Sequence, residues 1–369
     1  MRIPWVVRIP IRGARNALAR TRLIVRQLPR WRAIAAAAPS RDRLAVSYGV
    51  ERIPNLDEVV YGGGVKFQLL AEVLPNAPRD FNLLYLGSTT MPIEARMLVR
   101  LARRRGAAFV WNQNGVAYPG WHGPGWELVN APRARLFHEA DHVIFQSDFC
   151  RLGADRYYGE RAGPSEVLYN PVDTDRFTPP SQQPRRRPLT LLLGGNQYQR
   201  YRLEAALETL AILRREQEAR LLVTGFVAFD AVETIAKLGI EEHVEFTGPY
   251  TQRQAPELMW RADVLLHTKY NDPCPTIVLE SMASGLPVVY SASGGTPELV
   301  GPEAGVGVPA PLDWERDHPP APEALASAVR SVTARLDELR VAARARAEQF
   351  DARTWVARHR ELFERLVSG

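Results

Sequence analysis

The pattern of apolar and polar positions is most regular around residues 264–290. Residues 264–267 form an apolar run that ends in a polar, proline-containing loop at residues 269–275, and helical apolar spacing then runs from Thr276 until Gly285. A second apolar run follows at residues 287–290. This order is typical of a strand, helix and strand in a parallel α/β unit. The loop and the start of the helix are then expected at the carboxyl edge of the sheet, where such sheets bind ligands.

The same alternation extends over most of the chain. It predicts strands in two groups, at residues 44–48, 82–86, 107–111, 141–146 and 166–169, and at residues 189–193, 220–224, 244–247, 264–267, 287–290 and 305–308. Helices are expected at residues 65–74, 93–104, 134–140, 148–159, 201–215, 230–238, 252–261, 276–284, 322–348 and 352–366. Strands that alternate with helices in this way predict an α/β fold with two Rossmann-like parallel-sheet domains.

A proline- and arginine-rich segment separates the two groups of strands. The first group ends in NPVDTDRFTP at residues 170–179, and SQQPRRRP follows it. Such clusters favour a linker over a regular element. We therefore expect a basic N-terminal arm at residues 1–43, a first domain at residues 44–180, a linker at residues 181–188, a second domain at residues 189–350 and a C-terminal helix at residues 351–369.

Length and composition agree with two globular domains. A chain of 369 residues that is 46% hydrophobic and 24% charged can bury two cores of ordinary size. The sequence contains two cysteines, Cys150 and Cys274, which lie far apart in segments of different character. A disulfide framework or a zinc site is therefore not expected, and a reducing cytoplasm is the predicted compartment.

The positive charge is concentrated at the N-terminus. The net charge is +6, and residues 1–41 contain ten arginines and no carboxylate. Three interpretations compete for this partly amphipathic arm: a helix on an anionic membrane surface, a docking arm for a partner, and an organelle-type presequence. A solvated, poorly ordered extension is the plain alternative. Nucleic-acid binding is not expected, since no recognition motif accompanies the charge.

No apolar run approaches the roughly 20 residues of a membrane span. The first residues also lack the uninterrupted apolar region and the small-residue cleavage site of a secretory signal. These features predict a cytoplasmic protein that is peripheral on the inner membrane face if the arm binds lipid.

The start of the helix at Thr276 is a candidate anion site. The backbone N–H groups of Cys274, Thr276 and Ile277, next to Pro275, have no partner inside the helix, and the helix dipole adds positive potential. Two carboxylates flank this position. Asp272 lies in the loop, and Glu280 lies one turn into the helix, where it can accept hydrogen bonds from vicinal hydroxyl groups such as those of a ribose. The combination fits a sugar, a diphosphate and a nucleoside placed end to end.

These residues resemble the nucleotide-sugar site of the retaining glycosyltransferases of family 4, also called group 1. In that family two acidic residues eight positions apart bracket the donor, and a GG-x-PE segment follows. Here the acidic pair is Asp272 and Glu280, and the segment is GGTPE at residues 294–298. The first acid of the family is normally Glu, so Asp272 is shorter. The resemblance covers roughly residues 44–366 and implies a GT-B fold with a central cleft, donor contacts through Glu280 and Glu298, and a C-terminal helix that crosses back to the first domain.

The resemblance also assigns roles to residues that carry weaker signals. Gly194, Gly195 and Asn196 form a strand-to-helix turn suited to phosphate binding, and Arg200 or Arg202 would replace the basic residues that neutralise the diphosphate in the family. On sequence alone both arginines could also be helix-surface residues. Gly248 and Tyr250 lie where the family seats the base.

On the acceptor side the resemblance implicates residues of two loops. The glycine cluster with Gly63 and Gly64 opens a helix that faces the cleft in the family, although a plain strand-to-helix turn has the same pattern. The long loop at residues 112–126 contributes Asn114, Tyr118 and His122, of which the histidine could also be an ordinary loop residue.

The predicted reaction is transfer of a sugar from a nucleotide-diphosphate donor to a hydroxyl acceptor with retention of anomeric configuration, in glycan or glycolipid biosynthesis. Asp272, Arg200 and Arg202 are the expected catalytic residues, and no metal or other cofactor is expected. Two alternatives stay open. One is a nucleotide-sugar epimerase or hydrolase on the same fold, and the other is a catalytically silent scaffold.

Overall fold

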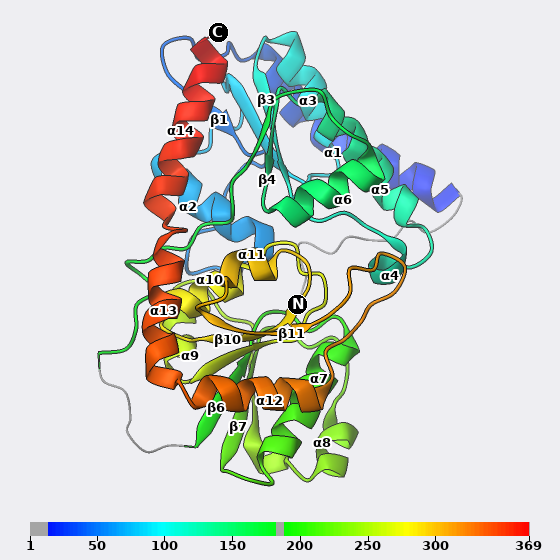
Figure 1. Cartoon of the computed structure of the whole chain (residues 1–369). Coiled ribbons are helices and arrows are strands. Elements are labelled where there is room, and N and C mark those ends of the chain that lie inside the picture. Colours follow the sequence, from blue (N-terminus) through cyan, green and yellow to red (C-terminus); the bar gives the residue numbers. More distant parts are fainter. Residues whose placement is uncertain (1–13, 182–187, 369) are drawn as a thin grey trace.

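The computed structural model describes residues 14–181 and 188–368, with side chains from residue 25 onward. Within these parts two sheets occupy separate lobes of the molecule (Figure 1). The first sheet has the strand order β1-β2-β3-β4-β5, and the second has the order β11-β10-β9-β6-β7-β8. All strand pairings in both sheets are parallel. The predicted α/β fold with two parallel-sheet domains is therefore confirmed.

The strands agree with the apolar runs to within a few residues. In the N-terminal domain they are β1 (Val46–Ser47), β2 (Leu83–Gly87), β3 (Ala108–Gln113), β4 (His142–Phe145) and β5 (Ser165–Val167). In the C-terminal domain they are β6 (Leu189–Leu193), β7 (Ala219–Thr224), β8 (Val244–Gly248), β9 (Val264–His267), β10 (Val288–Ala292) and β11 (Gly305–Pro309). Most central strands are buried along their whole length, which explains why they appear as continuous apolar runs.

Helices cover the sheets in the expected alternation. The N-terminal domain contains α1 (Ala14–Ala36), the short η1 (Gly62–Gly64), α2 (Val65–Val73), α3 (Ala95–Arg104), α4 (Pro119–His122), α5 (Trp126–Glu139) and α6 (Asp148–Tyr158). The rest of the chain contains α7 (Arg200–Leu213), α8 (Val232–Leu238), η2 (Glu241–His243), α9 (Ala255–Trp260), α10 (Thr276–Ala283), α11 (Thr296–Val300), α12 (Pro322–Thr333), α13 (Leu336–Glu348) and α14 (Ala352–Ser368).

The single helix expected at residues 322–348 is wrong. The helix breaks into α12 and α13, and Arg335 between them has non-helical backbone angles, φ −128° and ψ 30°. The two helices pack on different neighbours, α12 against α7 and β11 and α13 against α10. An apolar stripe alone does not reveal this change of partner. The short helices α4 and α11 were also not predicted, because they lie in segments with little periodic pattern.

The N-terminal domain begins before residue 44, so the expected limit of the basic arm at residue 43 is wrong. Ile34 near the end of α1 is buried in the same apolar cluster as Leu98 of α3. Arg30 forms ion pairs with Glu94, at 2.7 Å, and with Glu51, at 2.9 Å. The end of the arm is therefore part of the folded domain. Residues 1–13, and the side chains up to residue 24, lie outside the described part, so the membrane, partner and presequence interpretations of residues 1–41 stay predictions there.

The boundary near residue 180 also shifts. Val172 and Phe177 pack in the apolar cluster that contains Leu279 of α10 and Ala343 of α13. The backbone of Val172 is bonded on both sides to the chain before α14, since its N–H donates to Phe350 O and its carbonyl accepts from Ala352 N, both at 2.9 Å. The segment after β5 thus belongs structurally to the C-terminal domain although it precedes the linker.

Helix α14 returns to the N-terminal domain and runs along the side of that domain (Figure 1). Trp355, Leu362 and Phe363 are buried there in one apolar cluster with Tyr85 of β2. His359 of α14 lies at the centre of this contact, with its Nε2 3.0 Å from the Tyr85 hydroxyl and its Nδ1 3.0 Å from Trp355 O. Burial lowers the pKa of His359 to about 3, so this imidazole is neutral at physiological pH.

A second connection between the domains is the segment after β11. Trp314 leaves the C-terminal domain and is buried in the core of the N-terminal domain. Its ring stacks on Phe149 with centroids 5.0 Å apart and meets Tyr118 edge-on at 4.9 Å. The carbonyl of Trp314 accepts a hydrogen bond of 2.8 Å from Gly120 N. The two domains are therefore tied together at the side of the molecule opposite α14 as well.

Among the helices described in residues 14–181 and 188–368, none has both the length and the apolar character of a membrane span.

Replacing Trp314 with alanine is expected to lower the free energy of unfolding by about 3 kcal/mol, because truncating a buried tryptophan removes its transfer free energy and leaves a cavity. Denaturant titration followed by circular dichroism measures this change. The matched control is Leu312→Ala in the same segment, where the side chain is exposed and the change should stay within about 0.5 kcal/mol. Equal effects of the two substitutions would show that Trp314 does not hold the domains together.

Candidate active site

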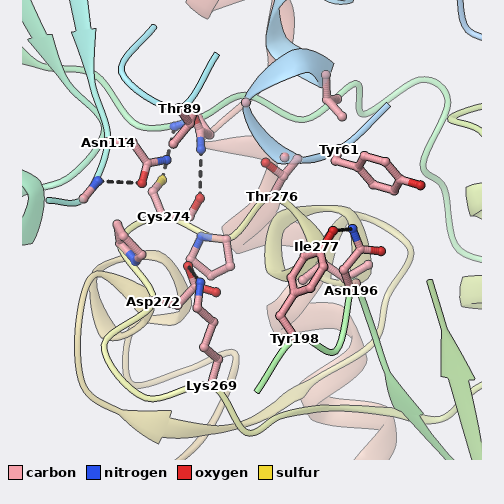
Figure 2. A pocket seen from close by; sticks show the side chains of 18 of the residues that line it. Tyr61, Thr89, Asn114, Asn196, Tyr198, Lys269, Asp272, Cys274, Thr276 and Ile277 are labelled. Carbon is pink, nitrogen blue, oxygen red and sulfur yellow. Dashed lines mark hydrogen bonds and ion pairs between the residues drawn. The ribbon is translucent and has the colours of Figure 1, made fainter. Parts of the chain in front are cut away.

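A cavity of about 570 Å³ lies between the two domains. Its walls come from the loops after β2 and β3 on one side and after β6, β7, β8 and β9 on the other. The carboxyl edges of both sheets therefore face the same space, as expected for ligand binding by parallel sheets. Figure 2 shows Thr89 and Asn114 above the loop that carries Asp272 and Cys274.

The loop between β9 and α10 forms the floor of this cavity and is fixed by hydrogen bonds from both domains. Ser147 of the N-terminal domain donates to Pro273 O at 2.7 Å. On the C-terminal side, Asn170 Nδ2 of the segment after β5 donates to Cys274 O at 2.8 Å, and Gly295 N donates to Asp272 O at 2.8 Å. The loop backbone is thus held before any ligand binds.

Steric crowding explains why glycine occupies positions 294 and 295. Gly294 has a φ of +67°, and a Cβ atom there would lie 2.5 Å from Asp272 O. A Cβ atom on Gly295 would collide with Pro273 O. Because both close approaches are made to backbone, which cannot rotate away, side chains at these positions would displace the loop.

Asp272 lies at the start of this loop with two basic neighbours. Its carboxylate is 3.2 Å from Lys269 Nζ and 3.2 Å from His267 Nε2. Burial opposes ionisation of Asp272, but the charge of Lys269 and the contact with His267 outweigh it, and its pKa falls below the usual value. Asp272 is therefore a carboxylate in the cavity, and Lys269 supplies a cation beside it.

Glu280 is buried, with 3% of its surface exposed, and it lines the cavity one turn into α10. Gln252 Nε2 donates to its Oε1 at 3.0 Å. Its other oxygen, Oε2, has no hydrogen-bond partner among the described residues. Burial raises the pKa of Glu280 to about 7, against the opposing effects of Gln252 and Arg176. The side chain thus combines a free acceptor oxygen with an energetic need for a polar partner.

Two family models together cover most of the chain that forms this site. The model described as Glycosyl transferases group 1 matches residues 175–347, and the model described as Glycosyltransferase Family 4 matches residues 64–176. This chain is a family 4 glycosyltransferase with the GT-B fold.

Relatives of this glycosyltransferase include lipid- and inositol-modifying enzymes. The chain is 29% identical over 315 residues to a GDP-mannose-dependent alpha-(1-6)-phosphatidylinositol monomannoside mannosyltransferase of Mycolicibacterium smegmatis, covering 77% of this chain and 76% of that one. It is 32% identical over 249 residues to a D-inositol 3-phosphate glycosyltransferase of Geodermatophilus obscurus, covering 59% of this chain and 52% of that one.

Solved structures with the same fold are more distant in sequence. Sucrose-phosphate synthase from Thermosynechococcus elongatus superposes with a TM-score of 0.65 at 18% identity, covering 94% of each chain. Anabaena HepE in complex with UDP and glucose superposes with a TM-score of 0.62 at 19% identity, covering 77% of this chain and 78% of that one. At these identities the likeness establishes the GT-B fold.

The structure brings most of the predicted site residues to the cavity of this glycosyltransferase. The residues that line it from the predicted donor side are Gly194, Gly195, Asn196, Arg202, Tyr250, Asp272, Cys274, Pro275, Thr276, Ile277 and Glu280. Those that line it from the predicted acceptor side are Gly63, Asn114 and Tyr118. The roles assigned to these residues stay predictions.

Arg200 and Arg202 differ sharply although they are two positions apart. Arg202 is buried at the cavity and donates from Nη1 to Asn196 O at 2.7 Å and from Nη2 to Gly194 O at 3.3 Å. Arg200 points away, with its guanidinium 4.7 Å above the Phe229 ring and 3.5 Å from Glu204. The prediction that Arg200 contacts the site is therefore wrong, because α7 turns it to the outer face.

Glu298 is not part of the cavity wall, so the donor contact predicted for it is also wrong. Its carboxylate accepts from the backbone N–H groups of Asp148 and Phe149 at 2.8 and 2.9 Å and from the Tyr169 hydroxyl at 3.0 Å. The two N–H groups begin α6 of the N-terminal domain, where a helix lacks internal acceptors. Glu298 thus caps a helix across the domain interface.

Three further candidates lie beside the cavity and do not line it. Gly248 ends β8 and accepts from Gly225 N through its carbonyl at 2.9 Å. Gly64 belongs to η1, and a side chain there would meet Val60. His122 ends α4, with Nδ1 3.4 Å from Gly123 O, so the ordinary loop histidine is the better description.

Sequence reasoning gave no role to Lys269, Arg133 and Trp121, which all line the cavity. Lys269 stands three positions before Asp272, so its spacing was a usable signal. Arg133 and Trp121 lie in segments whose orientation depends on how α4 and α5 pack, and nothing in their local sequence indicates a site. The described residues contain no group of three or more His, Cys, Asp or Glu side chains that could hold a metal ion, and the expectation of a metal-free reaction stays a prediction.

The different positions of the two arginines lead to a testable contrast in stability. Arg202→Met removes two hydrogen bonds from buried carbonyl groups of the glycine turn, and we expect it to lower the free energy of unfolding by about 1–3 kcal/mol. Arg200→Met removes an exposed contact and should change it by less than about 1 kcal/mol. Urea titration of both variants measures the contrast, and a larger loss for Arg200→Met would contradict the assignment.

Proposed function

We propose that this chain is a retaining glycosyltransferase that moves a sugar from a nucleotide-diphosphate donor to a hydroxyl group of a glycan or lipid-linked acceptor. The observation that carries the proposal is Glu280, a buried carboxylate with one free oxygen, placed one turn after a helix start that lines the same cavity. A carboxylate suits the hydroxyl pair of a ribose, and a helix N-terminus suits the adjoining phosphate.

The nucleoside would lie on the C-terminal domain. Glu280 Oε2 accepts from a ribose hydroxyl, while Gln252 holds the other oxygen in place. Pro249 and Tyr250, which follow β8, line the cavity next to Gln252 and offer an apolar surface to a base. This arrangement binds the part of the donor that does not react, and so it positions the diphosphate.

Bond breaking leaves negative charge on the diphosphate. The N-terminus of α10 and Lys269 line the cavity and can stabilise that charge. Arg202 holds the glycine turn in place through its hydrogen bonds to Asn196 O and Gly194 O. Arg202 also contributes a buried positive charge to this wall. Among the predicted catalytic residues, Arg202 and Asp272 remain in the proposal, and Lys269 takes the place of Arg200.

The transferred sugar would lie near Asp272, between the loop after β9 and the acceptor side with Gly63, Asn114 and Tyr118. Asp272 stays ionised because of Lys269 and His267, so it can accept hydrogen bonds from sugar hydroxyls. The leaving phosphate oxygen itself takes the proton of the acceptor hydroxyl, on the face from which it departs. That step is consistent with retention of configuration, which the family resemblance implies.

Similarity to known enzymes supports the substrate classes. The related Mycolicibacterium enzyme is named for GDP-mannose and a phosphatidylinositol mannoside, and the HepE structure contains UDP and glucose. Both are consistent with a nucleotide-sugar donor here, and the former with a lipid-linked acceptor. Placement in the cytoplasm at the inner membrane face, through the basic residues 1–41, stays a prediction.

The proposal is tested by titrating the protein calorimetrically with UDP-, GDP-, ADP- and TDP-sugars, followed by mass spectrometry of products formed with candidate acceptors. One donor is expected to bind, and Glu280→Gln should weaken it about 10- to 100-fold, since a carboxylate hydrogen bond is worth about 1.5–3 kcal/mol. Glu233→Gln, at an exposed residue of α8, is the matched control and should bind as the wild type does.

Three results would overturn the proposal. If Glu280→Gln binds the donor as tightly as the wild type does, the nucleotide does not bind at Glu280. Free sugar or an epimerised donor as the product, with every acceptor, would indicate a hydrolase or an epimerase. Tight donor binding without turnover would indicate a silent scaffold.

Donor affinity should depend on pH through Glu280. Its pKa in the free protein is raised to about 7 by burial, and the ionised form is the better acceptor for ribose hydroxyls. Affinity is therefore expected to fall as the pH drops below about 7 and to level off above it. The intact donor is a diphosphate diester, which does not titrate in this range.

Calorimetric titrations of the intact donor over this pH range measure the dependence. In Glu280→Gln the dependence should disappear, and a persistent slope would assign it to another group. The pH dependence of folding stability has the opposite sign to that of donor affinity. Because the folded protein holds this proton more tightly, the contribution of Glu280 to the free energy of unfolding falls as the pH rises from 4.5 to about 7.

A further inference from the structure

A strap of residues 310–318 connects the two walls of the cavity directly. It follows β11 in the C-terminal domain and passes close to α4 of the N-terminal domain before α12 returns to β11 (Figure 1). Tyr118 and Asn271, one on each wall, line the cavity. Trp314 of the strap and Tyr270 at its base contact these residues or adjoin them and, within the described chain, are not part of the lining. The strap therefore acts on the cavity through its neighbours.

The base of the strap is fixed to the loop between β9 and α10, which we call the donor loop. The Tyr270 hydroxyl donates to Pro311 O at 2.6 Å and accepts from Asp313 N at 2.9 Å. Asn271 Nδ2 donates to Asp313 O at 3.1 Å. Tyr270 is buried, and the two donor-loop residues directly precede Asp272. A movement of the strap is therefore transmitted to the backbone that carries the Asp272 carboxylate.

The conformation of Asn271 depends on this contact. Its φ is +48°, a left-handed backbone conformation that asparagine tolerates better than most other residues apart from glycine. The backbone N–H of Asn271 donates to Ser293 Oγ at 2.8 Å, while its side chain holds the strap. Backbone and side chain are thus fixed by two different segments, and losing the strap would free one of them.

Asp313 folds the strap into a compact turn. Its Oδ1 accepts from Glu315 N at 2.7 Å and from Arg316 N at 3.3 Å. Its Oδ2 lies 2.8 Å from His318 Nε2. Because the same residue is bonded to the donor loop through its backbone, the turn carries Trp314 toward the N-terminal domain from a fixed base.

The tip of the strap is fixed to the loop at residues 112–126, which we call the acceptor loop. The Trp314 ring meets Tyr118 edge-on, and its carbonyl accepts from Gly120 N at 2.8 Å. A Cβ atom on Gly120 would lie 2.8 Å from Arg316 N and 3.0 Å from Arg316 Cα. The backbones of strap and acceptor loop are therefore in direct contact, with no room for a side chain between them.

We propose that the strap is a positioning element for sugar transfer, which holds Tyr118 of the acceptor loop in register with Asp272 of the donor loop. This inference rests on the proposed function and adds the residues that align its two substrates. Transfer between two bound molecules is sensitive to their alignment, and a misplacement of about 1 Å can lower the rate by about 100-fold. A direct connection between the two walls limits such a misplacement.

Tyr270 and Trp314 are positioning residues in this view, since they act through cavity residues. Glu280 and Gln252, to which the proposed function assigns the nucleoside, belong to other elements, α10 and the segment before α9. Breaking the strap should therefore impair transfer much more than it impairs nucleotide binding. A loss of stability alone does not produce this separation.

The first test is the coupling of the two loops, and it needs no substrate. Tyr270→Phe keeps the ring and removes the hydroxyl that holds the base of the strap. The matched control is Tyr48→Phe, because Tyr48 is equally buried, 1% exposed, and its hydroxyl donates to Leu74 O at 2.7 Å in the apolar cluster under α14. Thermal unfolding should show similar losses of stability for the two variants.

Hydrogen exchange of the full chain, followed by mass spectrometry, then compares the variants. In Tyr270→Phe the peptide that contains Gly120 should exchange about 10-fold faster than in the wild type, as expected for losing about one hydrogen bond of protection. In Tyr48→Phe the same peptide should exchange as in the wild type. The reverse perturbation is Gly120→Ala, which displaces the tip and should speed exchange in residues 269–275, since coupling between two sites is reciprocal.

The second test separates transfer from binding. It uses the nucleotide sugar and the acceptor that react in the titration and product analysis described for the proposed function. Tyr270→Phe and Gly120→Ala should each lower kcat about 10- to 100-fold. Donor affinity measured by calorimetry should stay within about twofold of the wild type. Tyr48→Phe should keep both the wild-type kcat and the wild-type donor affinity.

The inference is overturned if the Gly120 peptide exchanges equally fast in Tyr270→Phe and Tyr48→Phe, or if both strap variants transfer sugar with the kcat of the wild type. Equal losses of kcat in Tyr270→Phe and in its control would also overturn it, since they would reflect stability alone. A wild-type protein that transfers no sugar contradicts the proposed function, and the exchange experiment still decides whether the strap couples the loops. Wild-type transfer that the strap variants retain contradicts this inference alone.

Discussion

The loop between β9 and α10 is the element on which the site depends, and its backbone is fixed by groups from both domains. Ser147 of the N-terminal domain holds Pro273 O, whereas Asn170 and Gly295, which belong structurally to the C-terminal domain, hold Cys274 O and Asp272 O. Each such bond contributes only about 1 kcal/mol to stability, but together they orient the amides that open α10. The close approach of Gly294 and Gly295 makes the same point sterically, since any side chain there would move the loop.

Fixing this loop couples the site to the way the domains are joined. Glu298 of the C-terminal domain caps the start of α6 in the N-terminal domain, and Trp314 is buried in the N-terminal core. On the far side α14 packs on β2 through His359 and its apolar neighbours. Outside the loop between β9 and α10, the two domains are therefore joined at three places, which fix how the two walls of the cavity face each other.

Charge is distributed over the cavity by domain. Among the described residues, the C-terminal wall combines ionised Asp272 with Lys269 and leaves one oxygen of Glu280 without a partner, whereas Arg133 of the N-terminal wall forms no ion pair with a carboxylate. Buried charges and free polar atoms are costly in an empty cavity and become favourable when a ligand pairs with them. The features that oppose folding of the free protein are those that a substrate would satisfy.

The sequence by itself determined the strands, most helices, the fold class and the placing of Asp272 and Glu280 on either side of the start of α10. These depend on local periodicity and on spacing along one loop and helix, which the sequence contains directly. The tertiary structure alone decided which side chains reach the cavity. Arg200 and Arg202 are two residues apart on a helix that turns about 100° per residue, so one faces the glycine turn and the other faces away. Glu298 and Trp314 act across the domain interface, and Arg133 points into the cavity only because α5 packs against the turn at Ser88. Such contacts join residues far apart in the chain, and no local pattern encodes their distance or direction.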